Sequence, residues 1–179
     1  MKPLLKRYRA FILTALAFGI FILFKRSIGM RALDITAYTL KEMALVIPPI
    51  FVLLGLLDIW VPRETMIKYM GEGSGLKGIL LAIFIGSAAA GPLYGAFPVA
   101  AVLMKKGVKF TNIMIFIGAW STTKIPMFLF EVTSLGMPFA LTRFLINIPG
   151  IIIIAAILSA IVSKKEIQRI YTKAEALNE

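Results

Sequence analysis

The residue with the clearest chemical potential in this sequence is Lys124, a lysine near the middle of a long apolar stretch. It is fifteenth of the 25 residues from Phe110 to Ser134, close to the centre of a predicted membrane span. A lysine at that depth costs about 3 kcal/mol on insertion scales. It should therefore face a polar cavity, a bound anion or a carboxylate of another helix. A purely structural ion pair is the alternative to a functional role.

The residues around Lys124 are polar and interrupt a helix. Positions 120–126 read WSTTKIP, so the hydroxyls of Ser121, Thr122 and Thr123 precede the lysine and Pro126 follows it. Irregular backbone inside a bilayer has to be satisfied by protein or by water, and such breaks gather where a helix lines a cavity. We expect these three hydroxyls to belong to a substrate site with Lys124.

A second interruption lies at positions 86–98, which read GSAAAGPLYGAFP. Six small residues in a row allow another backbone to approach closely. At Gly91 and Pro92 the chain can end one half-helix and start another, with free amides that could face an anion. Ser87 and Tyr94 add hydroxyls. A tight packing seam with an ordinary proline kink is the alternative.

Two further polar residues fall within apolar segments. Glu131 follows Lys124 by seven residues, about 10 Å along one helix face, which is too far for a direct bond. It stands near the end of its segment, and we expect it to lie in water. Asn147 must find a partner inside the bundle, and helix-to-helix bonding and pore lining are equal alternatives.

The elements that position these residues are predicted to be membrane helices. Hydrophobic residues make up 59% of the 179 positions and charged residues 16%, against about a quarter charged in a soluble domain. Apolar runs reach the roughly 20 residues that a span needs. We predict an all-α integral membrane protein with about five hydrophobic segments, at residues 8–24, 43–61, 79–104, 111–130 and 138–162. The third and fourth are broken, as discontinuous or re-entrant helices.

The segments between these runs are short, so residues 1–179 are predicted to form a single transmembrane domain. The first run is interpreted as an uncleaved helix, because basic residues follow it where a cleavage site would need small ones. Pro48 and Pro49 should kink or break the second run. Residues 62–70 are predicted to form an interfacial helix with Met66, Ile67 and Met70 toward lipid. Residues 164–179 are predicted to be a charged, solvated, helical tail.

The composition also excludes several classes of function. The chain contains no Cys and no His, so disulfides, zinc and haem sites and thiol chemistry are excluded, and we expect no metal and no cofactor. Without clustered carboxylates in the membrane, an enzyme is not expected. The net charge of +11 comes from Lys and Arg in the gaps between apolar runs, where they anchor helices at anionic headgroups. Membrane lipids, and no nucleic acid, are therefore the expected partners.

The sequence resembles a known family between about Val61 and Ser134. The run VPRETMIKYMGEGSGLKGILLAIFIGS, followed by GPLYGAFPVAAVLMKKGVKFTN, is similar to predicted permeases related to the organoarsenical exporter ArsP. Members carry a Pro-Leu-Cys-Ser-Cys-Gly element before a Pro-Val-Ala helix and a basic turn that ends in Lys-Gly. Here Tyr94 stands in place of the Cys-Ser-Cys, so arsenic cannot be held by thiols. The resemblance implies permease activity and names no substrate.

The resemblance also suggests that the chain corresponds to half of a usual member, so that two copies form one transporter. With five spans, the two sides of the membrane hold 8 and 11 Lys or Arg residues. So weak a bias suits insertion in both orientations and an antiparallel homodimer, an inverted repeat made of two chains. If the third segment is re-entrant, the counts become 14 and 5 and fix one orientation. The sequence leaves both arrangements open.

Taken together, these observations predict a multi-pass permease subunit in a bacterial inner membrane. It would act as a homodimer on a small molecule or ion, at a midplane site formed by the two breaks. The predicted site comprises Ser87, Gly91, Pro92, Tyr94, Ser121, Thr122, Thr123, Lys124 and Asn147. A channel-forming subunit and a membrane scaffold without transport are the alternatives.

Overall fold

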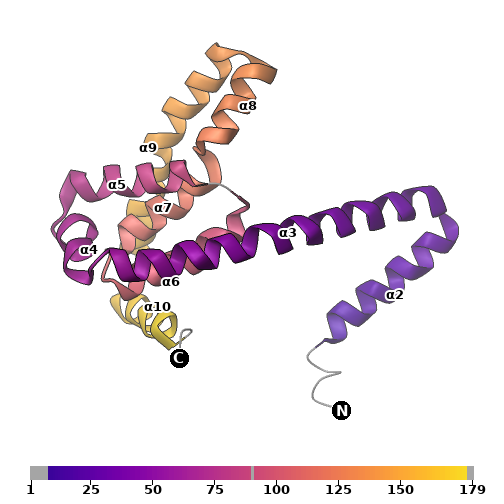
Figure 1. Ribbon diagram of the computed structural model, residues 1–179, viewed down its shortest axis with the longest axis horizontal. Coiled ribbons are helices and arrows are strands. Elements are labelled where there is room, and N and C mark those ends of the chain that lie inside the picture. Colours follow the sequence, from indigo (N-terminus) through magenta and orange to yellow (C-terminus); the bar gives the residue numbers. More distant parts are fainter. Residues whose placement is uncertain (1–7, 90, 177–179) are drawn as a thin grey trace. The chain divides into compact units, whose positions relative to one another are not determined.

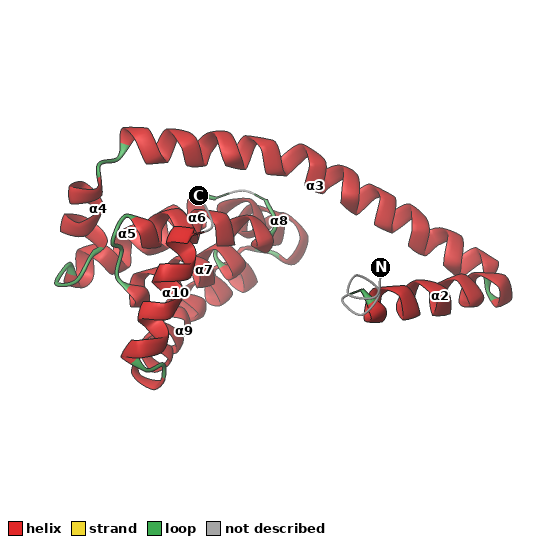
Figure 2. Cartoon of the chain, turned by 90° about the horizontal axis from the view of Figure 1, so that it is seen from below, coloured by secondary structure: helices red, strands yellow, loops and turns green. Residues whose placement is uncertain are grey.

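The computed structural model of the chain describes residues 8–89 and 91–176. The described residues are helices joined by short loops, and no β-strand occurs among them (Figure 2). The helices are α2 (Arg9–Phe24), α3 (Arg26–Trp60), α4 (Arg63–Met70), α5 (Gly75–Ala88), α6 (Ala96–Lys105), α7 (Phe110–Thr122), α8 (Ile125–Leu135), α9 (Met137–Ile161) and α10 (Lys164–Ala176), with a short 3-10 helix, η1 (Leu93–Gly95). The predicted all-α class is confirmed.

The chain divides into two compact units, Met1–Pro48 and Pro49–Glu179. In the first unit, α2 runs into α3 at Lys25 (Figure 1). Residues 26–41, which lie between the first two predicted segments, are helical and belong to α3. Pro48 and Pro49 were predicted to kink or break the helix, and they do not break it, because α3 continues through both. Two adjacent prolines remove two helical donors, yet the remaining hydrogen bonds keep all 35 residues of α3 helical.

The second unit is built around α7, which packs against α5 on one side and α9 on the other (Figure 1). Its buried residues include Ile113, Ile115 and Phe116, none of which exposes any surface. The approach of α5 is close. A Cβ added at Gly86 would lie 2.6 Å from the carbonyl oxygen of Phe116 and 2.8 Å from Cβ of Ala119. The small-residue run thus brings two backbones together.

Two surface predictions are corrected in this unit. Met66 and Met70 of α4 do not face lipid, because both are buried in the core formed by α5, α6 and α7. Of the expected tail at residues 164–179, residues 164–176 are helical and the last three lie outside the described residues, but the helix is not solvated all round. Helix α10 packs on α6, Ala174 is buried, and Tyr171 Oη donates to the carbonyl oxygen of Val108 at 2.6 Å.

Two stretches of this unit are long and apolar enough to cross a membrane. They are Phe110–Leu135, which comprises α7 and α8, and Met137–Ile161, which is α9. Helices α2 and α5, and the stretch Leu93–Lys105, are apolar but shorter. By length and composition, the first stretch corresponds to the fourth predicted segment and the second to the fifth. Lys124 lies within the first, between α7 and α8.

Candidate functional site

The first interruption separates α5 from α6. Helix α5 ends at Ala88, and Gly91 adopts a φ of 99°, a left-handed conformation that favours glycine over every residue with a side chain. Pro92 then contributes no N–H, and η1 begins at Leu93. The carbonyl of Gly91 receives no helical bond, because the N–H of Gly95 donates to Pro92 instead, at 3.0 Å.

The second interruption separates α7 from α8. Helix α7 ends at Thr122, and Lys124 adopts an extended conformation with φ −59° and ψ 135° before α8 starts at Ile125. Pro126 has no N–H to donate to the carbonyl four residues earlier, which is that of Thr122. Each interruption therefore leaves carbonyl oxygens that need donors from elsewhere in the protein.

The two interruptions lie together and satisfy one another. Lys124 Nζ donates to the carbonyl oxygen of Gly91 at 2.7 Å, and Trp120 Nε1 donates to that of Pro92 at 3.2 Å. The hydroxyls of Ser87 and Thr123 are 2.9 Å apart and buried. Since Thr123 Oγ1 donates to Ala119 at 3.1 Å, the Ser87 hydroxyl is the donor in this pair. Five of the predicted site residues (Ser87, Gly91, Pro92, Thr123 and Lys124) are thereby joined in one network.

The charge of Lys124 is not neutralised within this network. No carboxylate pairs with it among the described residues, and its partner there is a neutral carbonyl. An ammonium group has three donors, and one is used here. Because the side chain is partly buried, the unpaired charge makes this region attractive to an anion.

A buried ion pair lies beside the network, and its arginine was not predicted as a site residue. Arg143 Nε donates to Glu131 Oε2 at 2.6 Å, and Arg143 Nη1 donates to the carbonyl of Thr122 at 2.9 Å. Arg143 thus supplies the donor that Pro126 withholds. The expectation that Glu131 lies in water is wrong, since its side chain is 8% exposed. The arginine compensates the cost of burying that carboxylate.

The sequence contains a signal that would have found this pair. Helices α8 and α9 form an antiparallel hairpin around Gly136, and Glu131 and Arg143 each lie six residues from Met137. Residues equally far from a turn meet across such a hairpin. Phe128 and Phe144 also meet across this hairpin, with ring centroids 5.3 Å apart.

The remaining predicted site residues are not tied to Lys124 by any bond. The Thr122 hydroxyl donates to Gly118 within its own helix at 2.9 Å. Ser121 is exposed, and Tyr94 and Asn147 are partly buried. Within the described part of the chain, these three side chains make no hydrogen bond. Their donors and acceptors remain available to a ligand or to water.

Comparison with known protein families assigns this apolar, helical chain to a family. The ArsP_1 family, described as predicted permease, matches residues 29–178. The chain belongs to the ArsP_1 family. The match extends well beyond the Val61–Ser134 stretch on which the resemblance was noticed, and it includes both interruptions and the Glu131–Arg143 pair. No curated protein and no solved structure matches this chain.

Membership of the ArsP_1 permease family implies a membrane protein and favours transport over catalysis. The two candidate spans are consistent with that class. The sequence-based prediction of a permease related to ArsP is therefore confirmed at the level of the family.

Proposed function

We propose that this chain is a permease subunit of a bacterial inner membrane and that it carries a small anion past Lys124. The observation that carries the proposal is the bond from Lys124 Nζ to the Gly91 carbonyl. It places an ammonium group without a carboxylate partner where two helices are interrupted. Family membership supports the permease class, and the unpaired charge supports an anionic substrate.

In this proposal, α5 with α6 and α7 with α8 are two discontinuous membrane helices, and the site lies near the bilayer midplane. Discontinuous helices bind substrates in many transporters because their ends offer unpaired backbone groups. Lys124 would bind the anion, while Tyr94, Ser121 and Asn147, which have no partner of their own in the described chain, would donate hydrogen bonds. Ser87 and Thr123 would hold the two interruptions together.

The transport assay uses the purified chain in liposomes with labelled inorganic phosphate, sulfate and acetate, and with tetraphenylphosphonium as a lipophilic cation. We expect saturable uptake of at least one anion. Lys124→Gln should lower that uptake at least tenfold, and Lys124→Arg should retain part of it. Lys105→Gln is the matched control, because Lys105 is exposed in the last turn of α6 and lies outside the network.

Each other outcome identifies a rival function. Wild-type uptake by Lys124→Gln would refute the role of the lysine, and transport of the cation alone would refute the anionic substrate. A flux that does not saturate would indicate a channel. No flux of any probe, in a chain that is folded and inserted, would favour a scaffold without transport.

We further propose that the subunit acts as a homodimer, with two copies arranged as an inverted repeat. The small difference in Lys and Arg between the two sides of a five-span chain supports this arrangement. Reporters fused after Lys106 and after Glu179 test it. Signal from both compartments at each position supports an antiparallel dimer, and a single orientation rejects it.

A further inference from the structure

A pocket of about 710 Å³ lies at the other end of α7, away from Lys124. It is lined where α7 begins, where α9 ends and along α10. Helix α7 has 13 residues, so this pocket and the interruption at Thr123 are separated by roughly 20 Å. None of the predicted site residues lines it, and its role is separate from that of the Lys124 network.

The walls of the pocket combine polar and apolar residues. Lys109 and Lys164 provide two ammonium groups, while Ala156, Ala160 and Phe110 provide apolar surface. Ala156 and Ala160 are exposed on α9, one of the two helices long enough to span the membrane. A ligand in this pocket would therefore meet positive charge at one end and the lipid-facing side of α9 at the other.

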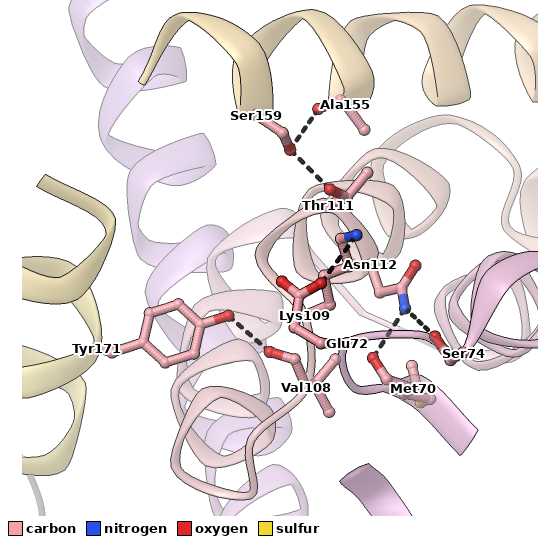
Figure 3. A network of polar contacts seen from close by, with 10 residues as sticks. All are labelled: Met70, Glu72, Ser74, Val108, Lys109, Thr111, Asn112, Ala155, Ser159 and Tyr171. Atoms are coloured by element: carbon pink, nitrogen blue, oxygen red, sulfur yellow. Dashed lines mark hydrogen bonds and ion pairs between the residues drawn. The ribbon is translucent and has the colours of Figure 1, made fainter. Parts of the chain in front are cut away.

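Several polar groups that line the pocket already bond to one another (Figure 3). Tyr171 donates to Val108, and the hydroxyls of Thr111 and Ser159 are 2.8 Å apart. These bonds fix the start of α7 to α9 and α10, so the walls are held in place by the protein itself. The two lysines are held less firmly than these groups. Lys164 is exposed, and Lys109 pairs at 3.1 Å with Glu72, whose side chain is itself largely exposed.

If α9 spans the membrane, the pocket lies at the boundary between lipid and water. The apolar helix ends at Ile161, and Lys164 and Lys165 follow within four residues. Lys105 is the last residue of α6, and Lys109 directly precedes α7, at the same end of α7 as the pocket. Basic residues in such positions attract anionic headgroups, and basic pockets beside membrane helices bind them.

We infer that this pocket binds an anionic phospholipid. The phosphodiester group would lie between Lys109 and Lys164, and the acyl chains would run along Ala156 and Ala160 of α9. Glu72 would compete for Lys109, and its 82% exposed side chain could turn into water when the lipid binds. A volume of about 710 Å³ is sufficient for a headgroup and the first part of its chains.

The test measures lipid binding to the purified full chain in a neutral detergent, by native mass spectrometry and by the shift in melting temperature. The probes are phosphatidylglycerol, phosphatidylcholine, and free glycerol phosphate as the soluble headgroup. We expect phosphatidylglycerol to bind and stabilise, and the other two to do so far less. Lys109→Gln with Lys164→Gln should weaken phosphatidylglycerol binding about 30-fold.

Three further variants make the test specific. Lys68→Gln with Lys173→Gln removes two exposed charges that do not line the pocket, and this control should bind as the wild type does. Ala160→Trp fills the apolar side without changing charge and should lower binding. Glu72→Gln removes the competitor of Lys109 and should raise it.

The inference fails if the Lys109 and Lys164 double variant binds phosphatidylglycerol like the wild type, or if the control variant loses as much. Equal stabilisation by glycerol phosphate would show a soluble phosphate ligand and overturn the lipid assignment. None of these readouts depends on transport, so the inference and the proposed role of Lys124 can fail independently.

Discussion

Arg143 Nη1 donates to the carbonyl oxygen of Thr122 at 2.9 Å, and this oxygen is the one that Pro126 leaves without a helical donor. One side chain on α9 therefore stabilises the end of α7. The same guanidinium binds Glu131 of α8 through Nε, while its Nη2 is buried without a hydrogen-bond partner in the described structure. The hairpin of α8 and α9 is thus fixed to the interruption that carries Lys124.

Removing the carboxylate of this pair should destabilise the protein more than removing both charges. Glu131→Gln leaves the Arg143 guanidinium, which is 21% exposed, without a counter-ion, and we expect a loss of about 3 kcal/mol in unfolding free energy. The double variant Glu131→Gln with Arg143→Gln should recover part of it. Denaturant titration of the detergent-solubilised chain measures both.

The matched control is the pair of Arg169 and Glu166 on α10, whose atoms are 3.8 Å apart and whose side chains are more than half exposed. Glu166→Gln should change stability by less than about 1 kcal/mol. Equal effects at the two pairs would show that Glu131 and Arg143 are not buried together.

Gly86 should tolerate no side chain, since α5 and α7 meet there. In Gly86→Ala the new Cβ would lie 2.6 Å from the Phe116 carbonyl, and a backbone atom cannot turn away as a side chain can. We expect a loss of about 1–3 kcal/mol. Gly150→Ala, in α9 with nothing within 4 Å, should be neutral or slightly stabilising. A melting temperature for Gly86→Ala as high as that of Gly150→Ala would contradict the close approach.

Trp120 should be shielded from quenchers in water. It is 5% exposed and bound to Pro92, whereas Trp60, the other tryptophan, is 72% exposed. In Trp60→Phe the remaining emission should come from the blue-shifted, poorly quenched Trp120. In Trp120→Phe it should come from the accessible Trp60. Acrylamide quenching of the two variants compares them directly, and equal slopes would place Trp120 outside the core.

The alkaline stability of the chain should depend on Tyr171. Burial, with a further contribution from Glu72, raises the pKa of its phenol from 10.0 to about 12. Below about pH 10 both the folded and unfolded states keep the proton, so the stabilising contribution is complete there. Between pH 10 and 12 the unfolded state loses its proton first, and stability falls as pH rises.

Melting curves at stepped pH, compared between the wild type and Tyr171→Phe, isolate this effect. The wild type should lose melting temperature more steeply above pH 10 than the variant does. Tyrosinate absorbance gives an independent measurement. If the difference in tyrosinate absorbance between the two proteins titrates near pH 10, the phenol is not buried against Val108.

The helical class of this protein can be predicted from its sequence because composition and the spacing of apolar residues determine helices within short stretches of chain. Apolar runs dictate helices, and Pro92 and Pro126 remove donors wherever the chain folds, so both interruptions were predictable. Lys124 stood out because a charge in an apolar run is costly in any fold. At Pro48 and Pro49 the same reasoning allowed a break that does not occur, because the hydrogen bonds of a long helix outweigh two missing donors.

What the tertiary structure decided is which groups meet. The local sequence pattern does not predict that Lys124 bonds to Gly91, 33 residues earlier. Nor does it predict that Arg143 replaces the donor missing at Thr122. It could not place Met66, Met70 and Ala174 in the core either, because burial depends on the partner helix. The sequence determined a helical chain with two interruptions and a lysine within an apolar run. The packing of α5 against α7, and of α8 against α9, brings side chains from elsewhere to the free carbonyls of each interruption. These contacts stabilise the fold because a polar group left without a hydrogen bond in an apolar medium costs free energy.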